Sequence, residues 1–405
     1  MPSAAKSQPA TAAAPQPAPL HKAAPVARPF AGLLEPVIIE EVPASPLPGA
    51  LVREHVEAAW TWTLRDLAPD LLSAERAANG SLTAAEVEAV ATELLARMKD
   101  HLARADADFD TGRRLRAMLG SDEARAALPA IIAALRHRAL LTKAQGFGRA
   151  VNAISEEAAL VTALQSMPVQ DPALAGLLFL AATGQVTNPS RLVLAVIKIC
   201  GNPTEAAIIR SGFAPLIDGL LTQAHNQLHL MKPMGPFADI DLTCRGLDRF
   251  HRLVRAVTGF VELTRGGRWT AALSSLTRQV SERIEPRLKT VATDVNMAMR
   301  RGREGSDRLD NSAILSAMGG VYLMAAVREC RDSLAVNATF DQAWSQTGQA
   351  LETHIERNLD LLRRQPGDPV VGGRLDAAIK MAEVRFNADY ADTLRRARAA
   401  AERRS

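Results

Sequence analysis

The sequence predicts an all-α protein, and three observations indicate this class. Residues 171–233 contain short apolar segments that open with an Asp-Pro or Asn-Pro pair and are followed by glycine. From about residue 237 onwards, large apolar side chains recur at alternating steps of three and four, which is the spacing of one helix face. No alternating polar and apolar run predicts a sheet, and the sequence has no repeat of fixed period.

The composition suggests three regions. Residues 1–49 are expected to form a disordered tail rich in Pro and Ala, residues 50–235 a compact helical domain, and residues 236–405 a bundle of long antiparallel helices. A chain of 405 residues is long enough for two or three domains of about 150 residues each. With 47% hydrophobic but only 4% aromatic residues, the core has to consist mainly of aliphatic side chains.

An apolar strip interrupts the low-complexity N-terminal region at residues 30–39. Its large side chains are Phe30, Leu33, Leu34, Val37, Ile38 and Ile39. Exposed apolar surface is costly, so something is expected to cover the strip. It packs on the chain's own helices, or it docks on a partner protein by strand addition or in a groove. We favour packing on the chain's own helices in the free protein, with release to a partner as the regulated event.

The first helices are marked by periodicity and by one sharp start signal. Residues 51–64 follow a helical face. Thr83 and Glu86 match a capping box that precedes the apolar face of residues 87–98. Further helices are expected over residues 109–119, from about Pro129, and over residues 146–166, with a break at the glycines of residues 146–148.

Residues 171–233 are predicted to be a buried helical core. A side-chain acceptor followed by proline marks each expected helix start, at Asp171-Pro172, Asn188-Pro189 and Asn202-Pro203. Glycine stands where each helix should end, at Gly184, Gly201 and Gly212. The segments between are apolar nearly all round, as in helices that lie inside a large protein.

The C-terminal part changes to long helices. Apolar faces follow one another over residues 247–261, 269–295, 314–325, 340–362 and 375–397. Pro286 predicts a kink in the second face, and Gly319-Gly320 interrupts the third. The loops between them are short, so successive helices should be antiparallel neighbours. A homo-oligomer formed through these long helices is compatible with the pattern.

Composition and cysteine use favour the bacterial cytoplasm. Cys200, Cys244 and Cys330 are an odd number without local pairing, which suits a reducing compartment. No apolar run reaches the roughly 18 to 20 residues that span a bilayer, and the N-terminus lacks the apolar segment of a secretory signal. Abundant Ala and Arg fit a GC-rich bacterial genome. We therefore expect a cytoplasmic protein without a membrane span.

One pair of histidines carries a metal-site hypothesis. His225 and His229 are four residues apart, so on a helix both imidazoles could face one Zn²⁺ ion, with Cys244 as a further ligand. The glutamate of the zinc-protease helix motif is absent between them, and histidines at this spacing commonly cap or line a helix. We favour the interpretation without metal or cofactor. Asp239 and Asp241 are expected to cap the next helix rather than to chelate a metal.

Arginine clusters carry a nucleic-acid hypothesis. They lie at residues 113–116, 300–303, 363–364 and 395–404, while the formal net charge of the chain is only +4. Most are expected at helix C-termini, where cations complement the helix dipole. Aromatic side chains that would stack single-stranded bases do not interleave with them. Nucleic-acid binding therefore stays an alternative.

No motif indicates a catalytic mechanism. The sequence has no glycine-rich phosphate loop, no GxSxG and no histidine placed by sequence to activate a cysteine. We predict a non-enzymatic helical interaction or regulatory protein that binds a protein partner. The alternatives are a nucleic-acid-associated helical protein, and an all-α metal-binding protein or enzyme that uses His225 and His229. The last alternative requires that the helices bring these side chains into a concave, polar pocket.

Overall fold

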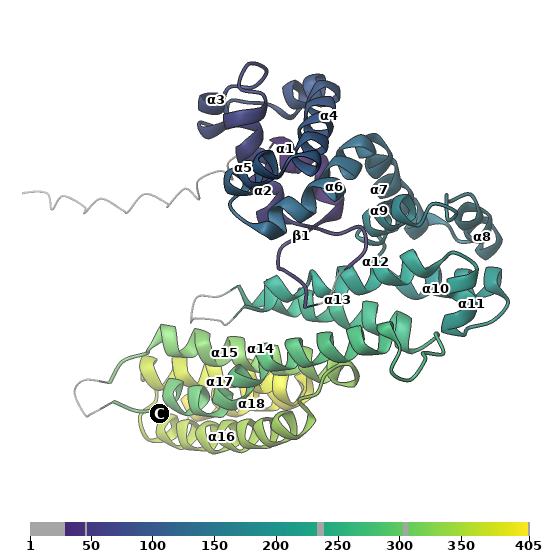
Figure 1. Cartoon of the computed structure of the whole chain (residues 1–405). Helices are drawn as coiled ribbons and strands as arrows, with labels where there is room; N and C mark the ends of the chain where they lie inside the picture. The colour runs from purple at the N-terminus through teal and green to yellow at the C-terminus, as the bar shows by residue number, and fades with distance from the viewer. Residues whose placement is uncertain (1–28, 45–46, 233–238, 303–306, 404–405) are drawn as a thin grey trace, which may run out of the picture.

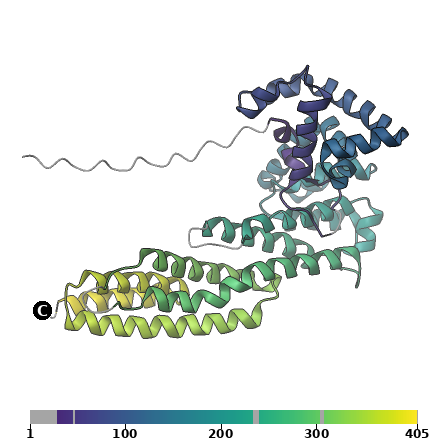
Figure 2. The same cartoon turned by 60° about the vertical axis from the view of Figure 1, so that its left-hand side comes forward.

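The computed structural model describes residues 29–44, 47–232, 239–302 and 307–403. The predicted all-α class is confirmed, because most of these residues are helical and their strands are limited to one two-residue pair. Of the disordered tail expected over residues 1–49, residues 1–28 lie outside the described residues, whereas residues 29–39 form short helical and strand elements. Figures 1 and 2 show an N-terminal group of helices, a middle group, and an elongated C-terminal bundle in which the chain ends.

The N-terminal group covers residues 29–153. Its elements are α1 (Pro29–Leu34), the 3-10 turn η1 (Glu35–Val37), β1 (Ile38–Ile39), β2 (Leu51–Val52), α2 (Arg53–Trp62), the π-helical turn η2 (Thr63–Leu67), α3 (Ala74–Ala78), α4 (Ala84–Ala107), α5 (Phe109–Leu119), α6 (Asp122–Arg136) and α7 (Arg138–Ala153). The capping box of Thr83 and Glu86 opens α4 as predicted. The helix expected from Pro129 begins earlier, because the Ser121 side chain accepts a hydrogen bond from the backbone N–H of Ala124 and thereby caps α6.

The middle group covers residues 157–231. Its elements are α8 (Glu157–Gln165), α9 (Pro172–Thr183), α10 (Pro189–Cys200), α11 (Glu205–Arg210), α12 (Ala214–His225) and the 3-10 turn η3 (Leu228–Met231). Asp171 caps α9 as predicted. The start expected at Pro203 is wrong by two residues, because Thr204 caps α11 and Asn202 accepts a hydrogen bond from the Thr204 backbone instead. Gly201 and Gly212 are left-handed as expected, whereas Gly184 ends α9 in a right-handed conformation.

The break expected at residues 146–148 is also wrong, since α7 runs through them. A Cβ on Gly148 would lie 2.1 Å from the carbonyl oxygen of Ala182 in α9. Glycine at this position therefore lets α7 and α9 approach closely and does not interrupt the helix.

The C-terminal bundle begins after residue 239. Its elements are α13 (Ile240–Thr258), α14 (Arg268–Ala298), α15 (Asn311–Cys330), the 3-10 turn η4 (Arg331–Ser333), α16 (Asn337–Arg364), α17 (Pro369–Arg385) and α18 (Ala388–Glu402). Asp239 caps α13 as predicted. Helix α14 continues through Pro286. Helix α15 continues through Gly319-Gly320, so the interruption expected at these two glycines is wrong. A Cβ on Gly320 would lie 2.9 Å from the Val291 side chain, which explains the second glycine by close helix packing.

The apolar core has two parts. One part runs from Phe30 to Ala144 and includes inner residues of α9. The second part is continuous from Val151 to Ala401. Helices α10 and α12 pack against α13 within this second part. The boundary predicted at residue 235 therefore falls inside a shared core.

Residues 38–42, called the strap below, connect the N-terminal group to the other two groups. β1 pairs in parallel with β2 inside the N-terminal group. The backbone N–H of Glu40 donates to Asn226 Oδ1 over 2.9 Å, and the Glu41 carboxylate forms an ion pair with Arg283 of α14 (Nη1 to Oε1, 3.0 Å). The strap is thus bonded to residues that lie 186 and 242 positions later in the sequence.

Candidate functional site

The three residues proposed as zinc ligands are not arranged as one site. α12 ends at His225, and His229 lies in the following 3-10 turn, so the two histidines do not share a continuous helix face. His225 Nε2 lies 3.0 Å from the carbonyl oxygen of Glu41, and His229 Nδ1 contacts the carbonyl oxygen of Asn226. Cys244 is half-buried on α13, and burial raises the pKa of its thiol to about 11. In the described part of the chain, no group of three or more His, Cys, Asp or Glu side chains could hold a metal ion.

The apolar strip lies in the chain's own core. Five of its six side chains are buried and Leu33 is half-buried, because α1 packs against α2, α4, α6 and α7, and η1 packs against α9. The Phe30 ring stacks on Trp60 with their centroids 5.1 Å apart. In this structure the strip is therefore a core segment and presents little apolar surface to a partner.

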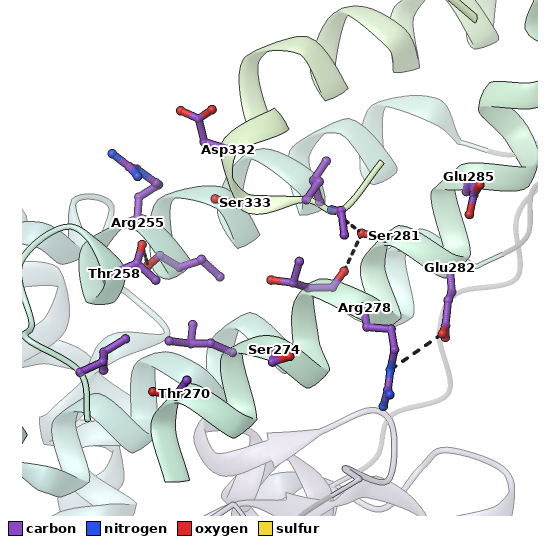
Figure 3. Close-up of a pocket in the computed structure, with 16 residues that line it drawn as sticks. Arg255, Thr258, Thr270, Ser274, Arg278, Ser281, Glu282, Glu285, Asp332 and Ser333 are labelled. Atoms are coloured by element: carbon purple, nitrogen blue, oxygen red, sulfur yellow. Dashed lines mark hydrogen bonds and ion pairs between the residues drawn. The ribbon is translucent and has the colours of Figure 1, made fainter. Parts of the chain in front are cut away.

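A groove of about 710 Å³ lies between α13, α14 and residues 332–335. Figure 3 shows hydroxyl side chains along its length, with Arg255 and Asp332 toward one end and Arg278, Glu282 and Glu285 toward the other. Four of these hydroxyls come from one face of α14, because Thr270, Ser274, Thr277 and Ser281 recur at steps of three and four. The floor includes the apolar side chains of Val254, Leu263, Leu273 and Leu334.

Several polar groups of this groove are already bonded within the chain. Ser281 Oγ accepts from the Ala335 backbone over 2.9 Å and donates to the carbonyl oxygen of Thr277 over 2.6 Å. The hydroxyls of Thr258 and Thr270 also donate to backbone carbonyl oxygens. The bonded hydroxyls of the groove are therefore not poised as nucleophiles.

One serine–histidine contact adjoins the groove. His251 Nδ1 lies 2.9 Å from Ser333 Oγ, and burial lowers the pKa of His251, which keeps the imidazole neutral at pH 7. A catalytic serine also needs a group that orients the base and donors that stabilise an oxyanion. In the described ranges no carboxylate hydrogen-bonds to the other ring nitrogen of His251, and Ser333 is buried. We interpret the pair as a structural bond between α13 and η4.

A different surface stands out on α15. This helix packs against α13, α14 and α17, and its residues Val321, Leu323, Met324 and Val327 are buried. On its remaining side lies a row that we call the outer seam, made of Asn311, Leu315, Met318, Tyr322, Ala325 and Glu329. Leu315 is 58% exposed and Tyr322 is 48% exposed. Because α15 is apolar on both sides, it presents large apolar side chains to solvent among the described residues.

The apolar composition of α15 also raises the question of whether this helix could span a membrane. The segment Asn311–Ser333 is long and apolar enough to cross a membrane by length and composition, with a mean hydropathy of 1.3. A core helix of a soluble protein passes the same test, and the inner face of α15 serves the bundle core. The segment is therefore weak support for a membrane span.

Arginines gather at one end of the bundle. The C-termini of α14, α16 and α18 and the N-termini of α15 and α17 lie together there, near the chain end in Figures 1 and 2. The exposed arginines that follow or precede these helix ends are Arg300, Arg301, Arg308, Arg363, Arg364 and Arg403, called the basic end below. Arg363 pairs with Asp360 at 2.6 Å, and Arg301 lies 3.8 Å from Asp307. Several of these clusters are recognisable in the sequence, but their convergence depends on the helix directions.

Comparisons with protein-family models, with curated proteins and with solved structures find no match for this chain.

Proposed function

We propose that this chain is a non-enzymatic helical interaction or regulatory protein of the bacterial cytoplasm, and that it binds a protein partner through the outer seam of α15. One observation carries the proposal, the exposure of Leu315 and Tyr322 on an otherwise packed helix. Large exposed apolar side chains that line up on one face are typical of interaction sites. The three free cysteines and the alanine- and arginine-rich composition support the assignment to the bacterial cytoplasm.

The spacing of the seam favours a helix as the docking element. Its residues step by 4, 3, 4, 3 and 4, which is the a/d pattern of a coiled-coil seam. An amphipathic helix of the partner would place its own apolar row against Leu315, Met318 and Tyr322.

The test is a pull-down with the full chain and with a Leu315→Glu/Tyr322→Glu variant. Loss of partners from the variant, with an unchanged melting temperature, is the expected result because both side chains are largely outside the core. Phe109→Glu is the matched control, since Phe109 is also exposed but lies on α5, away from the seam. Equal recovery of partners by the seam variant and the wild type contradicts the proposal.

The basic end favours nucleic-acid binding as a second candidate function. Phosphate contacts would come from arginines of several helix ends, and their affinity falls steeply with salt because bound counterions are released. A purely structural role also explains these arginines, because cations at helix C-termini complement the helix dipole. We expect an Arg363→Glu/Arg364→Glu variant to lose any low-salt gel shift that the wild type gives. No complex with micromolar wild-type protein at low salt would eliminate this candidate.

A further inference from the structure

We propose that residues 40–42 of the strap occupy a binding site for an acidic peptide segment, and that a partner protein displaces them with a segment of its own. The site consists of His225 and Asn226 at the end of α12 and Arg283 of α14. It shares no residue with the outer seam of α15, so this inference goes beyond the proposed function. The strap itself shows which ligand chemistry the site accepts.

Three contacts define that chemistry. Asn226 Oδ1 accepts a hydrogen bond from the backbone N–H of Glu40 over 2.9 Å, and His225 Nε2 donates to the carbonyl oxygen of Glu41 over 3.0 Å. These two contacts use main-chain groups, so they accept any side chain at either position. Arg283 adds selectivity, because both of its terminal nitrogens contact the Glu41 carboxylate, Nη1 at 3.0 Å from Oε1. The site therefore fits a peptide with an acidic residue at the position of Glu41.

The charges around the Glu41 carboxylate also favour an acid. The hydrogen bond from Arg283 lowers the pKa of the Glu41 carboxyl, burial acts against it, and the nearby charge of Lys232 lowers the pKa further. The guanidinium group has a second anchor, since Arg283 Nη1 also donates to the carbonyl oxygen of Leu228 in η3. Arg283 is thus oriented by a rigid element as well as by the strap, as a binding site requires.

The strap residues can leave this site without drawing an apolar side chain out of the core. Val42 is 63% exposed, and the side chains of Glu41 and Arg283 are only partly covered. Ile38 and Ile39, which precede the contacts, are buried in the N-terminal group and can stay there. A partner segment would replace each contact by one of the same kind, so the exchange requires no new site.

The covalent connection of the strap sets how strongly a free peptide competes. A segment tethered by a short flexible connection acts at an effective concentration on the order of millimolar. The apparent affinity for a free peptide is reduced by the fraction of molecules in which the site is open. We therefore expect weak binding to the wild type and tighter binding once the strap's own contact is weakened.

The first experiment titrates the full chain into a fluorescent peptide and follows its anisotropy. The peptide has two serines followed by the sequence of residues 40–44. Glu41→Lys should release the strap, because the lysine faces Arg283, and should raise the affinity for the peptide about tenfold or more over the wild type. Adding Arg283→Glu should abolish this binding, since the reversed ion pair closes the strap and the site then repels an acidic peptide.

Two controls accompany this titration. Adding Arg278→Glu instead of Arg283→Glu is the matched change on α14, because Arg278 is exposed and pairs with Glu282. It should leave the affinity of the Glu41→Lys protein unchanged to within about twofold, since exposed charges are screened by salt. A peptide with glutamine in place of its second glutamate should bind about tenfold more weakly, because it cannot form the ion pair.

Circular dichroism establishes that the Glu41→Lys protein is folded. A folded Glu41→Lys protein that binds neither peptide, or that binds both equally well, overturns the inference.

The second experiment uses the wild type and needs no variant to fold. The backbone N–H of Glu40 is bonded to Asn226 in the closed strap, so its hydrogen exchange should be slowed. The acidic peptide at about 5 mM, which matches the effective concentration of the strap, should speed this exchange and leave the amides of α14 unchanged. An exchange rate at Glu40 that does not respond to the acidic peptide, or that responds equally to the glutamine peptide, overturns the inference.

A strap exchanged between two copies of this chain is the competing outcome. Sedimentation equilibrium of the wild type would then show a dimer that Glu41→Lys and Arg283→Glu each dissociate. This result would identify the occupant as the strap of a second copy, and the inference of a separate partner protein would be wrong.

Discussion

His225 shows how the environment of one residue decides between two chemical roles. Its side chain is 3% exposed, and Nε2 lies 3.0 Å from the carbonyl oxygen of Glu41 in the strap. A carbonyl oxygen only accepts, so Nε2 carries the proton of a neutral imidazole. Burial lowers the pKa of His225, whereas the hydrogen bond from Arg283 lowers the pKa of the Glu41 carboxyl. The residue is therefore bonded to the strap rather than held open for a metal ion.

This geometry predicts a pH dependence of stability. The pKa of His225 is lower in the folded than in the unfolded chain, so the unfolded state binds more protons below the ordinary histidine pKa of 6.5. Its contribution is fully present above pH 6.5 and decreases as the pH falls toward the folded pKa. We expect the melting temperature to fall between pH 7.5 and 5.5, and His225→Gln, which keeps an N–H donor, to reduce this fall. Thermal melts at three pH values measure it.

Three other histidines are also expected to contribute to the pH dependence of stability. Burial also lowers the pKa of His101, His251 and His354, so part of the pH dependence must remain in the variant. A His225→Gln protein with the same pH dependence as the wild type would show that the strap contact does not contribute.

At the residue level, the sequence predicted helix caps correctly but could not predict hydrogen bonds between residues far apart in the chain. Thr83 with Glu86, Asp171 and Asp239 were found as caps, because a cap bonds to residues two or three positions away. The partner of His225 is 184 residues away in the chain, and no sequence spacing indicates it. The interval of four between His225 and His229 was misleading, because the helix ends at the first of them.

At the level of elements, the strip shows that an apolar segment can be a core element despite a low-complexity setting. Leu34 and Ile38 lie in the N-terminal core, whereas Val42, four residues farther, is 63% exposed. The apolar side chains of the strip predicted that something would cover it. In the structure, α2, α4, α6, α7 and α9 pack against the elements that contain it.

Substituting the buried strip residues should destabilise the N-terminal group. We expect Leu34→Asp with Ile38→Asp to cost at least about 3 to 6 kcal/mol, from the loss of two buried apolar side chains. The melting temperature should fall by several degrees, as measured by circular dichroism. Val42→Asp is the control in the same segment and should leave the melt unchanged. An unchanged melt for the double variant would mean that the strip does not belong to the core in solution.

The two neighbouring glycines of α15 give opposite expectations. Gly319→Ala should stabilise the monomer by about 0.5 to 1 kcal/mol, because alanine is the better helix former and nothing lies within 4 Å of the new Cβ. Gly320→Ala should destabilise it, because the new Cβ would lie 2.9 Å from Val291. Urea denaturation at low protein concentration compares the two. Equal effects of both substitutions would contradict this assignment of inner and outer faces.

Element prediction succeeded where the signal was local and failed where packing decided. The long faces of the bundle were predicted from the steps of three and four, which belong to one helix. Pro129 and the glycines of residues 146–148 were misread as boundaries, since proline and glycine also occur inside helices that other contacts stabilise. The outer seam was not identified, because an all-round apolar helix does not reveal by sequence which side stays uncovered.

For the whole molecule, the shared core determines how the chain can be divided. Apart from the inner residues of α9 that belong to the N-terminal core, the buried apolar residues between Val151 and Ala401 form one core, with α12 and α13 in contact across residue 235. Cutting there would expose the side of α13 that packs on α10, α12 and η3.

A fragment of residues 239–405 should therefore be less stable than the same helices in the full chain. Each apolar side chain on this side of α13 that becomes exposed is expected to cost about 1.5 to 3 kcal/mol. Differential scanning calorimetry should show a lower melting temperature, and a hydrophobic dye should bind the fragment but not the full chain. A fragment that melts at the temperature of the full chain would identify two independent domains with a boundary near residue 235.

The strap also has a consequence for the order in which the protein is made. Glu41 and its partner Arg283 are 242 residues apart, so one leaves the ribosome long before the other exists. At about 5 to 20 residues per second, the strap waits about 12 to 50 seconds for α14. The strap is thus synthesised early but reaches one of its final neighbours much later. Until then Glu41 has no counterpart in the bundle, whereas the carboxylate of Glu40 already has Arg53, 13 residues away.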